Sequence, residues 1–375
     1  MSNKKIAFLT GTRADFGKIK SLIQALEDNL NYTPYVFVTG MHLMQEYGYT
    51  LIEIERCGFK HIDTFQNHTD ETTMDLTLAK TIEGFSGYIK KVKPDLIVVH
   101  GDRVEALAGA IVGSLNNILV AHIEGGEVSG TIDELIRHSV SKMSHLHYVA
   151  NDLAKKRLIQ MGELDDNIHV IGSPDVDIMF SNNLPSLKEV KEYYEIPFEN
   201  YGVVMYHPVT TEINEMENYA SQFVDALLMD NRNYVVIFPN NDLGSKEILK
   251  AYKRLKNNVR FKVFPSIRFE YFLTLLKKSD FIIGNSSAGI REAPYYGIAT
   301  INIGTRQENR SLHEHIIHSD YKSESVYNSI QRVKSIKIKK SKPIFGFGNS
   351  AELFVKSLNN LSFNKDNVQK QFIDL

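Results

Sequence analysis

The residues with the clearest chemical potential lie in the stretch Gly284–Pro294, which contains two serines and a glutamate. The stretch follows a short apolar run, Asp280–Ile283, and its pattern predicts the start of a helix. Hydroxyls and unpaired N–H groups at a helix N-terminus attract a phosphate, so Ser286 and Ser287 are candidate phosphate ligands. Glu292 lies about one helical turn further along, where its carboxylate could accept hydrogen bonds from a sugar diol. The arrangement predicts a sugar-nucleotide site, and the alternative is an ordinary serine N-cap followed by a solvated glutamate.

Three carboxylates in the first half of the chain stand where predicted strands end or a predicted helix begins. Asp102 comes soon after the apolar run 96–100, and Glu124 directly follows the run 119–123. Asp133 begins the helical pattern that comes next. Neighbouring parallel strands end at one edge of a sheet, so we expect these groups to cluster. Because crowded carboxylates do not all ionise together, one can act as an acid and another as a base. We therefore predict that all three are catalytic.

Each of these carboxylates also has a structural alternative. The first aspartate could form an internal ion pair with Arg103 at a helix start. The two glycines after Glu124 could form a simple flexible turn. Thr131 and Glu134 fit a capping box, which would account for those two residues but leaves Asp133 unexplained. A purely structural explanation would require all of these alternatives to be true at once, so the catalytic interpretation is favoured.

The turn after the first predicted strand carries cationic groups. Within Gly11–Lys18, Arg13 and Lys18 offer donors for phosphate oxygens. The stretch is not a nucleotide-binding P-loop, because it lacks the Gly-Lys-Ser/Thr ending. A solvated turn capped by Asp15 is an equal alternative.

In the second half, a histidine and two arginines follow predicted strands. His207 comes after the run 203–206, where it could donate to a phosphate or to a developing charge. Arg306 and Arg310 follow the run 300–303 and are candidate phosphate or inter-domain contacts, or solvated side chains.

Composition limits the partners that the chain could have. Its 375 residues carry a net charge of −2, which gives no general attraction to nucleic acid or to anionic membranes. The single cysteine, Cys57, excludes an intrachain disulfide and a cysteine zinc site. No apolar run approaches about 20 residues and no signal-peptide pattern opens the chain, so we expect no membrane span and a cytoplasmic location. Several histidines lack the spacing of a metal-ligand triplet, and we interpret them as packing residues, with no metal predicted. These are His100, His122, His138, His145 and His147.

Short apolar runs alternate with helical patterns along the whole chain. Runs that are apolar almost throughout are typical of parallel strands covered on both faces, and strand–helix–strand units then give doubly wound domains. The predicted strands are 6–10, 35–39, 96–100, 119–123, 146–149 and 169–171 in a first series, and 203–206, 234–238, 260–264, 281–283 and 300–303 in a second. The predicted fold class is α/β, with two Rossmann-like domains, 1–180 and 181–375, and a ligand site in the cleft between them. The helical pattern after Asn349 could pack back on the first domain.

Taken together, these motifs resemble the UDP-N-acetylglucosamine 2-epimerases, specifically the hydrolysing branch that supplies N-acetylmannosamine for sialic acid synthesis. The resemblance covers nearly the whole chain, and a string of motifs in this order is far more specific than any one of them. The matching motifs are Gly11–Lys18, Thr39–His42, His100–Glu105, His122–Glu127, His207–Thr211, Phe238–Asp242, Pro265–Tyr271, Gly284–Pro294 and Gly304–Gln307.

The resemblance implies a glycosyltransferase-B-type architecture in which the second domain grips UDP and the first carries the catalytic carboxylates. It implies catalytic roles for Asp102, Glu124, Asp133 and His207. The implied contacts to UDP and the sugar are Arg13, Ala14, Lys18, His42, Arg103, Asn240, Ile267, Ser286, Ser287, Glu292 and Arg306. No cofactor is implied, in agreement with the absence of a Gly-x-Gly-x-x-Gly fingerprint after the first strand. Bacterial relatives are typically homodimers, so the resemblance also implies a homodimer.

The implied reaction has two stages. UDP leaves by anti elimination across C1–C2, and the resulting 2-acetamidoglucal is hydrated on the face that inverts C2. We assign Asp102 to the elimination, with Glu124 and Asp133 serving the hydration, although the sequence does not settle which carboxylate removes the proton.

Four alternatives remain open at this stage. Relatives that act on UDP-2,4-diacetamido-2,4,6-trideoxyglucose, on the way to legionaminic acid, share the same motifs. A non-hydrolysing epimerase would return UDP-N-acetylmannosamine. A true glycosyltransferase or a non-catalytic nucleotide-sugar binder could use the same fold.

Overall fold

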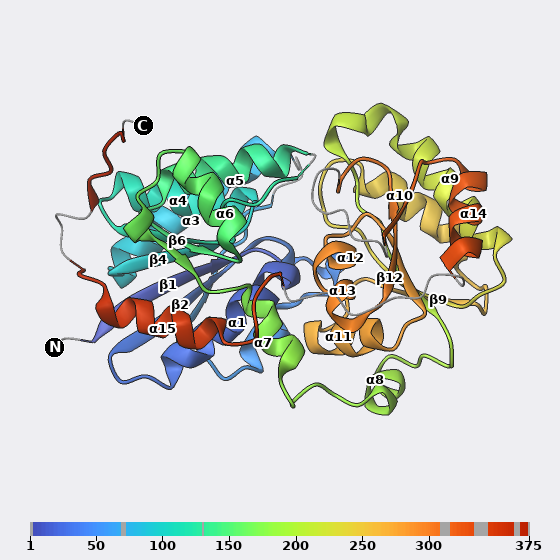
Figure 1. Cartoon of the computed structure of the whole chain (residues 1–375), viewed down its shortest axis with the longest axis horizontal. Helices are drawn as coiled ribbons and strands as arrows, with labels where there is room; N and C mark the ends of the chain where they lie inside the picture. The colour runs from blue at the N-terminus through green and yellow to red at the C-terminus, as the bar shows by residue number, and fades with distance from the viewer. Residues whose placement is uncertain are drawn as a thin grey trace. The chain divides into compact units, whose positions relative to one another are not determined.

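Two parallel β-sheets, each covered by helices on both faces, form the cores of two compact units in the computed structural model (Figure 1). The structure describes residues 3–68, 73–129, 131–307, 316–333, 344–363 and 368–373. Unit 1 comprises Met1–Glu127, Asp133–Asn182 and Ile344–Leu375, and unit 2 comprises Val128–Ile132 and Asn183–Pro343.

Unit 1 contains a seven-stranded sheet in the order β3-β2-β1-β4-β5-β6-β7, and every pair of neighbours is parallel. Its strands are β1 (Lys4–Thr10), β2 (Tyr32–Val38), β3 (Ile62–Thr64), β4 (Leu96–His100), β5 (Leu119–Ile123), β6 (Leu146–Val149) and β7 (Ile168–Val170). Its helices are α1 (Arg13–Glu27), α2 (Leu51–Glu55), α3 (Met74–Val92), α4 (Val104–Leu115), α5 (Ile132–Met143), α6 (Asp152–Gln160), α7 (Pro174–Phe180) and α15 (Ser350–Asn360).

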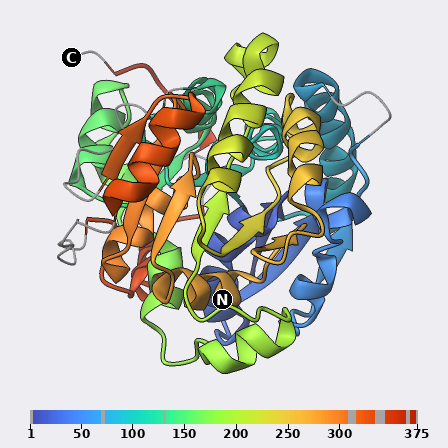
Figure 2. The same cartoon turned by 90° about the vertical axis from the view of Figure 1, so that its right-hand side faces the viewer.

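Unit 2 contains a six-stranded parallel sheet in the order β10-β9-β8-β11-β12-β13 (Figure 2). Its strands are β8 (Gly202–Met205), β9 (Tyr234–Ile237), β10 (Phe261–Phe264), β11 (Phe281–Gly284), β12 (Ala299–Ile303) and β13 (Ile316–Ser319). Its helices are α8 (Leu187–Tyr193), α9 (Met216–Met229), α10 (Ser245–Tyr252), α11 (Phe269–Lys277), α12 (Ala288–Arg291), α13 (Ala293–Tyr296) and α14 (Ser323–Arg332).

Both sheets have the strand order of a doubly wound nucleotide-binding domain, in which the chain reverses its direction of progress beside the first strand. The predicted α/β fold class is therefore confirmed. All eleven predicted strands are present, with ends shifted by at most three residues, whereas β3 and β13 were not predicted. The structure contains no described helix that is long and apolar enough to cross a membrane.

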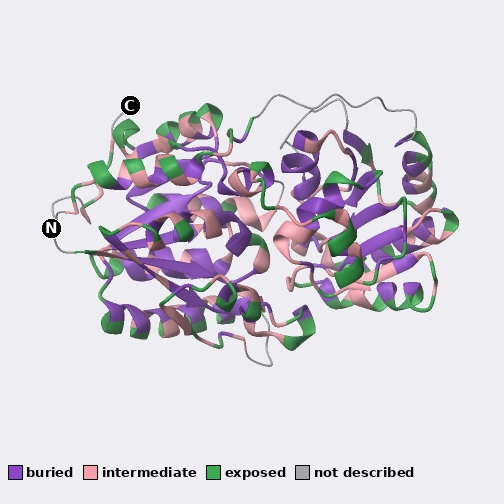
Figure 3. Ribbon diagram, turned by 90° about the horizontal axis from the view of Figure 1, so that it is seen from below, coloured by how far each residue is buried: buried purple, intermediate pink, exposed green. Residues whose placement is uncertain are grey.

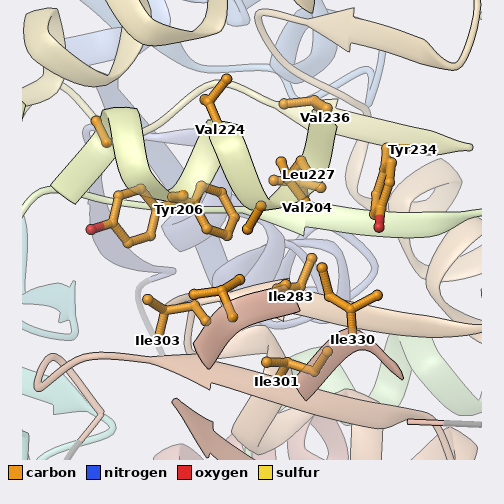
Figure 4. Close-up of a cluster of buried hydrophobic side chains, with 14 of the residues drawn as sticks. Val204, Tyr206, Val224, Leu227, Tyr234, Val236, Ile283, Ile301, Ile303 and Ile330 are labelled. Carbon is orange, nitrogen blue, oxygen red and sulfur yellow. The ribbon is translucent and has the colours of Figure 1, made fainter. Parts of the chain in front are cut away.

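The strands are buried and the outer faces of the helices are exposed (Figure 3). In unit 2, α9, α10 and α14 cover one face of the sheet, where Val204, Val236, Ile283 and Ile301 pack against Leu227 and other helix residues (Figure 4). Such strands bury side chains on both faces, which explains why they appear in the sequence as continuous apolar runs.

In unit 1, the last described helix packs beside the first one. Phe354 of α15 is fully buried in a cluster with Phe8, Ile23 and Tyr148, and its ring meets that of Tyr148 at 4.8 Å between centroids. The backbone N–H groups that open α15 are bound by Asp177 at 2.8 Å each, so the helix is fixed at its end as well as along its face.

We predict that Phe354→Ala lowers the free energy of unfolding by about 3–5 kcal/mol, because it leaves a cavity in a core that has little freedom to collapse. Phe372→Ala is the matched control, since that ring is 89% exposed and its loss should change stability by less than about 0.5 kcal/mol. Urea unfolding of both variants followed by circular dichroism would measure the difference. Equal midpoints for the two variants would contradict the assigned packing of α15.

Candidate active site

The candidate residues of each unit gather around the point where the strand order reverses. In unit 1 this point lies between β1 and β4, and in unit 2 it lies between β8 and β11. In open α/β sheets, ligands bind outside the carboxyl ends of the strands at such switch points. The predicted site residues come from these strand ends or from the segments that follow them.

Asp102 follows β4 and is held by an arginine that the sequence analysis did not single out. Arg137 of α5 forms an ion pair with its carboxylate and also donates to the carbonyl oxygen of Glu127 at 3.3 Å. The guanidinium is almost completely buried, whereas about a quarter of the Asp102 side chain is exposed. The exposed face leaves a carboxylate oriented by a fixed cation but still accessible to a ligand.

Glu124 follows β5 on the neighbouring strand, and its carboxylate is surrounded by donors. Oε1 accepts from the Ser173 hydroxyl and lies 3.4 Å from Nζ of Lys18, while Oε2 lies 3.3 Å from Nε2 of His100. The backbone of Glu124 has a φ of +64°, a left-handed conformation that costs energy for a residue with a side chain. Strain of this kind is common where a side chain must be aimed into a functional site.

Lys18 joins this group from the first turns of α1. Its Nζ lies 2.9 Å from Oδ2 of Asp175, so the cation is shared between two buried carboxylates. The sequence predicted a phosphate contact for Lys18, whereas in this structure it balances charge beside Glu124.

Asp133 lies in the first turn of α5 and is partly exposed. It stands four residues before Arg137, which places both side chains on the same face of the helix. Helix α5 therefore carries both Asp133 and the arginine that binds Asp102. The four-residue spacing between Asp133 and Arg137 is the sequence signal that could have identified Arg137.

The N-terminus of α1 is closed by a capping box. Thr12 accepts from the N–H of Asp15, and the Asp15 carboxylate accepts from the N–H of Thr12 at 3.1 Å and of Gly11 at 3.0 Å. Burial raises the pKa of Asp15, while the hydrogen bond from Thr10 acts in the opposite direction. Of the two predicted contacts in this turn, Ala14 is exposed and Arg13 is half-buried, with a guanidinium nitrogen 3.5 Å from Glu53.

His42 is fully buried, and a hydroxyl group lies beside each nitrogen of its ring. The Thr10 hydroxyl lies 2.5 Å from Asp15 and 3.0 Å from Nε2 of His42, and the Thr50 hydroxyl lies 2.6 Å from Nδ1. Burial, followed by the positive charge of Arg13, lowers the pKa of His42 to about 3. The residue is therefore a neutral hydrogen-bonding link behind the turn, and its predicted role in substrate binding becomes an indirect one.

Arg103 is supported by a buried glutamate. Its Nε lies 3.4 Å from Oε2 of Glu105, which is 1% exposed. The Glu105 carboxylate sits against Gly11 and Gly40, where a Cβ would approach it to 2.8 Å in each case. Both glycines are thus required by close approach to this side chain, and the carboxylate fixes the base of Arg103.

In unit 2, Asn285 connects the candidate residues. Its side chain is fully buried and exchanges two hydrogen bonds with the backbone of His207, at 2.7 Å and 2.8 Å. Its carbonyl oxygen accepts from Arg306 at 3.3 Å and from Gln307 at 2.9 Å. The side-chain amide and the backbone carbonyl of Asn285 thereby join the ends of β8, β11 and β12, and the sequence-based prediction did not include this residue.

His207 in turn fixes the loop after β9. Its Nδ1 accepts from the N–H of Asn240 at 3.0 Å, and the Asn240 amide donates to Asp242. Nδ1 of His207 thus accepts from the backbone of the loop after β9, which fixes the orientation of the ring.

Ser286 and Ser287 follow β11, where Gly284 allows an unusually close approach of two strands. Gly284 has a φ of +137°, and a Cβ there would lie 1.9 Å from the Met205 carbonyl oxygen. Ser287 stands at the N-cap of α12, but its side chain makes no capping hydrogen bond. The Ser286 hydroxyl, however, accepts from the N–H of Ala288 at 3.3 Å, so the alternative of a serine that caps the helix stays open for this residue.

The helix expected after these serines is in fact two short ones. Glu292 separates α12 from α13, and Pro294 occupies the first turn of α13, where its missing N–H is tolerated. Each helix has four residues, so the dipole expected at a helix N-terminus is small, and the serine hydroxyls are the groups here that could bind an anion. Glu292 is 4% exposed.

The remaining predicted residues of unit 2 lie on neighbouring loops. Ile267 is buried directly before Arg268, whose N–H donates to the Tyr194 hydroxyl at 2.9 Å and whose guanidinium lies over the ring of Tyr193. Arg310 lies outside the described residues.

The candidates thus divide between the two units. The first set is Arg13, Ala14, Lys18, Asp102, Arg103, Glu124 and Asp133, and the second is His207, Asn240, Ile267, Ser286, Ser287, Glu292 and Arg306. Among the residues that the structure describes, no group of three or more histidine, cysteine, aspartate or glutamate side chains is arranged to hold a metal ion.

A fold with two doubly wound sheets and polar residues at both switch points defines a class of nucleotide-binding α/β proteins. Comparison with known sequences narrows this class to one family. The sequence profile of the UDP-N-acetylglucosamine 2-epimerase family matches residues 24–359. The chain belongs to this family.

Individual relatives agree with this assignment. A UDP-N-acetylglucosamine 2-epimerase from Neisseria meningitidis serogroup B is 48% identical over 99% of both chains. A UDP-N,N'-diacetylbacillosamine 2-epimerase (hydrolyzing) from Legionella pneumophila is 31% identical over 93% of this chain and 94% of the relative. The crystal structure of Methanocaldococcus jannaschii UDP-GlcNAc 2-epimerase with UDP-GlcNAc and UDP aligns with a TM-score of 0.81 at 22% identity, covering 95% of this chain and 99% of that one. This likeness in fold supports the predicted glycosyltransferase-B-type architecture.

We predict that the free energy of unfolding falls as the pH is lowered from about 6.5. In the unfolded chain His42 binds a proton near its ordinary pKa, whereas in the folded protein the buried ring stays unprotonated until about pH 3. The folded pKa is lowered, so the contribution of His42 is complete above its ordinary value and is lost progressively below it. Each such group adds up to about 1.4 kcal/mol per pH unit.

Urea unfolding at several values between pH 7 and pH 5 would measure this slope, and His42→Gln should reduce it without removing it. Part of the slope remains because burial also lowers the pKa of His122 to about 3. His318→Gln, at an exposed histidine, is the control and should keep the full slope. An unchanged slope in His42→Gln would mean that the ring is not held neutral.

Proposed function

We propose that the chain is a hydrolysing UDP-N-acetylglucosamine 2-epimerase that converts UDP-N-acetylglucosamine and water into N-acetylmannosamine and UDP. The observation that carries the choice of substrate is the 48% identity to the Neisseria enzyme over 99% of both chains. The hydrolysing outcome is supported by the Legionella relative, which is named as a hydrolysing enzyme.

The proposed reaction balances in two steps. A base removes the proton at C2, the C1–C2 double bond forms, and the C1–oxygen bond breaks so that UDP leaves with the electron pair. Water then adds its oxygen to C1 of the 2-acetamidoglucal, and a proton adds to C2 on the opposite face from the one that was lost. The sugar product is free N-acetylmannosamine.

The carboxylates of unit 1 are the proposed acid and base groups. Asp102 suits the removal of the C2 proton, because its carboxylate is oriented by Arg137 and remains partly exposed. Glu124 and Asp133 are proposed to serve the hydration of the glucal, with Arg103, Arg13 and the backbone at Ala14 contributing to the substrate site.

Unit 2 is the proposed holder of UDP. Ser286, Ser287 and Arg306 offer neutral and cationic donors to phosphate oxygens, and Glu292 offers acceptors to a ribose diol. His207 is proposed to donate from Nε2 toward the departing diphosphate, since its Nδ1 is already occupied by the N–H of Asn240. A donor that is fixed before the reaction needs no rearrangement as charge develops on the leaving group.

By extension of the family resemblance, we propose unit 1, which includes residues 344–375, as the catalytic half and unit 2 as the nucleotide-binding half. On the same ground we propose a cytoplasmic homodimer whose product enters sialic acid synthesis for a surface polysaccharide. Sedimentation velocity would test the dimer independently of activity.

A second candidate keeps the chemistry and changes the sugar. The 31% identity to the Legionella enzyme supports a diacetamido trideoxy sugar nucleotide as substrate. The higher identity to the Neisseria enzyme favours UDP-N-acetylglucosamine. Parallel assays with both sugar nucleotides would separate the two, and turnover of the diacetamido sugar alone would overturn our first choice.

Product analysis in heavy water tests the reaction itself. Incubation with UDP-N-acetylglucosamine should give stoichiometric free UDP and free N-acetylmannosamine with solvent deuterium at C2. UDP-N-acetylmannosamine as the only sugar product would identify a non-hydrolysing epimerase, and UDP release that depends on an added acceptor would identify a glycosyltransferase. Binding without turnover would identify a nucleotide-sugar sensor.

We predict that Asp102→Asn lowers kcat about 10²- to 10⁴-fold, the usual contribution of a general base, and leaves the Kd for UDP essentially unchanged. Steady-state kinetics and calorimetric titration with UDP would measure the two quantities. Asp165→Asn, at an exposed aspartate paired with Lys155, is the control and should behave as the wild type. Wild-type turnover in Asp102→Asn would refute its assignment as the base.

A further inference from the structure

The buried polar group around Glu124 contains two residues to which the proposed mechanism gives no role. Ser173 and Asp175 flank Pro174, the first residue of α7, and both are at most 1% exposed. Ser173 donates to Oε1 of Glu124, and Asp175 binds Lys18, which reaches the same oxygen.

We propose that Ser173 and Asp175 are positioning residues that set the charge state and orientation of Glu124, one by donating to it and the other by competing for its cation. Only the expected effect on the pH dependence of turnover rests on the proposed function. The contacts of Ser173 and Asp175 do not depend on which reaction the protein catalyses.

The two residues act on Glu124 with opposite sign. The Ser173 hydroxyl stabilises the ionised carboxylate, since a hydrogen bond to a charged acceptor favours the charged form. Asp175 opposes it, because a second anion nearby disfavours ionisation and because it draws Lys18 to 2.9 Å while Lys18 stays 3.4 Å from Glu124. Ser173 and Asp175 therefore bias the protonation of Glu124 in opposite directions, and the balance between them would set how readily it exchanges a proton.

The other titratable groups that face Glu124 come from the two central strands. His100 at the end of β4 lies 3.3 Å from Oε2, and His122 of β5 interacts with the Glu124 charge. Burial lowers the pKa of His122 to about 3, so this ring is neutral at the working pH and its hydrogen bonds go to Gly101 and Ser141. Lys18 is therefore the fixed cation of the group, and Ser173 and Asp175 are the groups that adjust its effect.

The anchoring of α7 explains how these two residues keep their positions. The N–H of Ser173 donates to the Phe345 carbonyl oxygen at 2.6 Å, and Gly172 packs against Gly346 so closely that a Cβ would come within 2.9 Å of its Cα. Two residues beyond Asp175, Asp177 points to a different target and binds the opening N–H groups of α15. The same short helix thus offers one aspartate directed at the Glu124 group and one that is purely structural.

This pair of aspartates provides a matched test. Ser173→Ala should move the acid limb of the pH–rate profile to higher pH by about one unit, and Asp175→Asn should move it to lower pH by a similar amount. Asp177→Asn should lower the thermal midpoint and leave the limb in place. The profile is measured with 2-acetamidoglucal as substrate, so that only the hydration step is followed.

A titration that does not depend on activity distinguishes failure of this inference from failure of the proposed function. The protein is labelled with ¹³C at the glutamate carboxyls, and the Glu124 signal is assigned by its loss in Glu124→Gln. Opposite displacements of the Glu124 titration midpoint in Ser173→Ala and Asp175→Asn support the inference, even if the wild type fails to turn over UDP-N-acetylglucosamine. Displacements of the same sign, or midpoints equal to that of Asp177→Asn, overturn it, even in an active enzyme.

Discussion

A buried carboxylate is stable only when donors and a compensating charge surround it, and most of unit 1 is arranged to meet that condition for Glu124. Donors come from α1 and from the turn before α7, and His100 at the end of β4 lies beside the carboxylate; these segments are far apart in the sequence. The left-handed backbone of Glu124 adds a cost that the same contacts must offset. The packing of α1, α7 and α15 against one another is therefore not independent of the chemistry, because it holds the lysine and the serine at the carboxylate.

The parallel sheet imposes a second constraint. Its interior positions must be apolar on both faces, so the polar groups that do chemistry can stand only where the strands end. In both units the chain reverses direction beside the first strand, and in folds of this kind the loops at that point diverge and leave room for a ligand. This geometry explains why Asp102 and Glu124, on adjacent strands, share one edge, and why His207 and Ser286 share another.

These two constraints also explain how much of the protein could be predicted from its sequence. The buried strands were recognisable as apolar runs, and the candidates were recognisable because polar residues follow those runs. The strands β3 and β13 were missed because they are short edge strands with polar residues such as Asp63 and His318. The partners of the candidates were missed for another reason: Lys18 and Asp175 lie 157 residues apart, and no local pattern links them. His42 shows another limit: its contact with the substrate was implied only by the family resemblance, and the sequence did not indicate that its side chain is fully buried.

The two units share one topology, but the groups at their switch points differ in charge and hydrogen-bonding character. This difference is the basis of the different roles that we propose for them. An oxygen anion needs donors, and the edge around Asn285 supplies hydroxyls, an amide network, the His207 ring and the guanidinium of Arg306. The edge around Glu124 supplies carboxylates balanced by Lys18 and Arg137, which would repel a diphosphate but suit the transfer of protons at an uncharged sugar. Glu292 is the exception in unit 2, and it is consistent with the same rule, since a carboxylate among hydroxyl donors is suited to a diol rather than to a phosphate. The division of labour that we propose therefore follows from the signs of the groups at each edge and does not depend on which hexosamine the enzyme accepts.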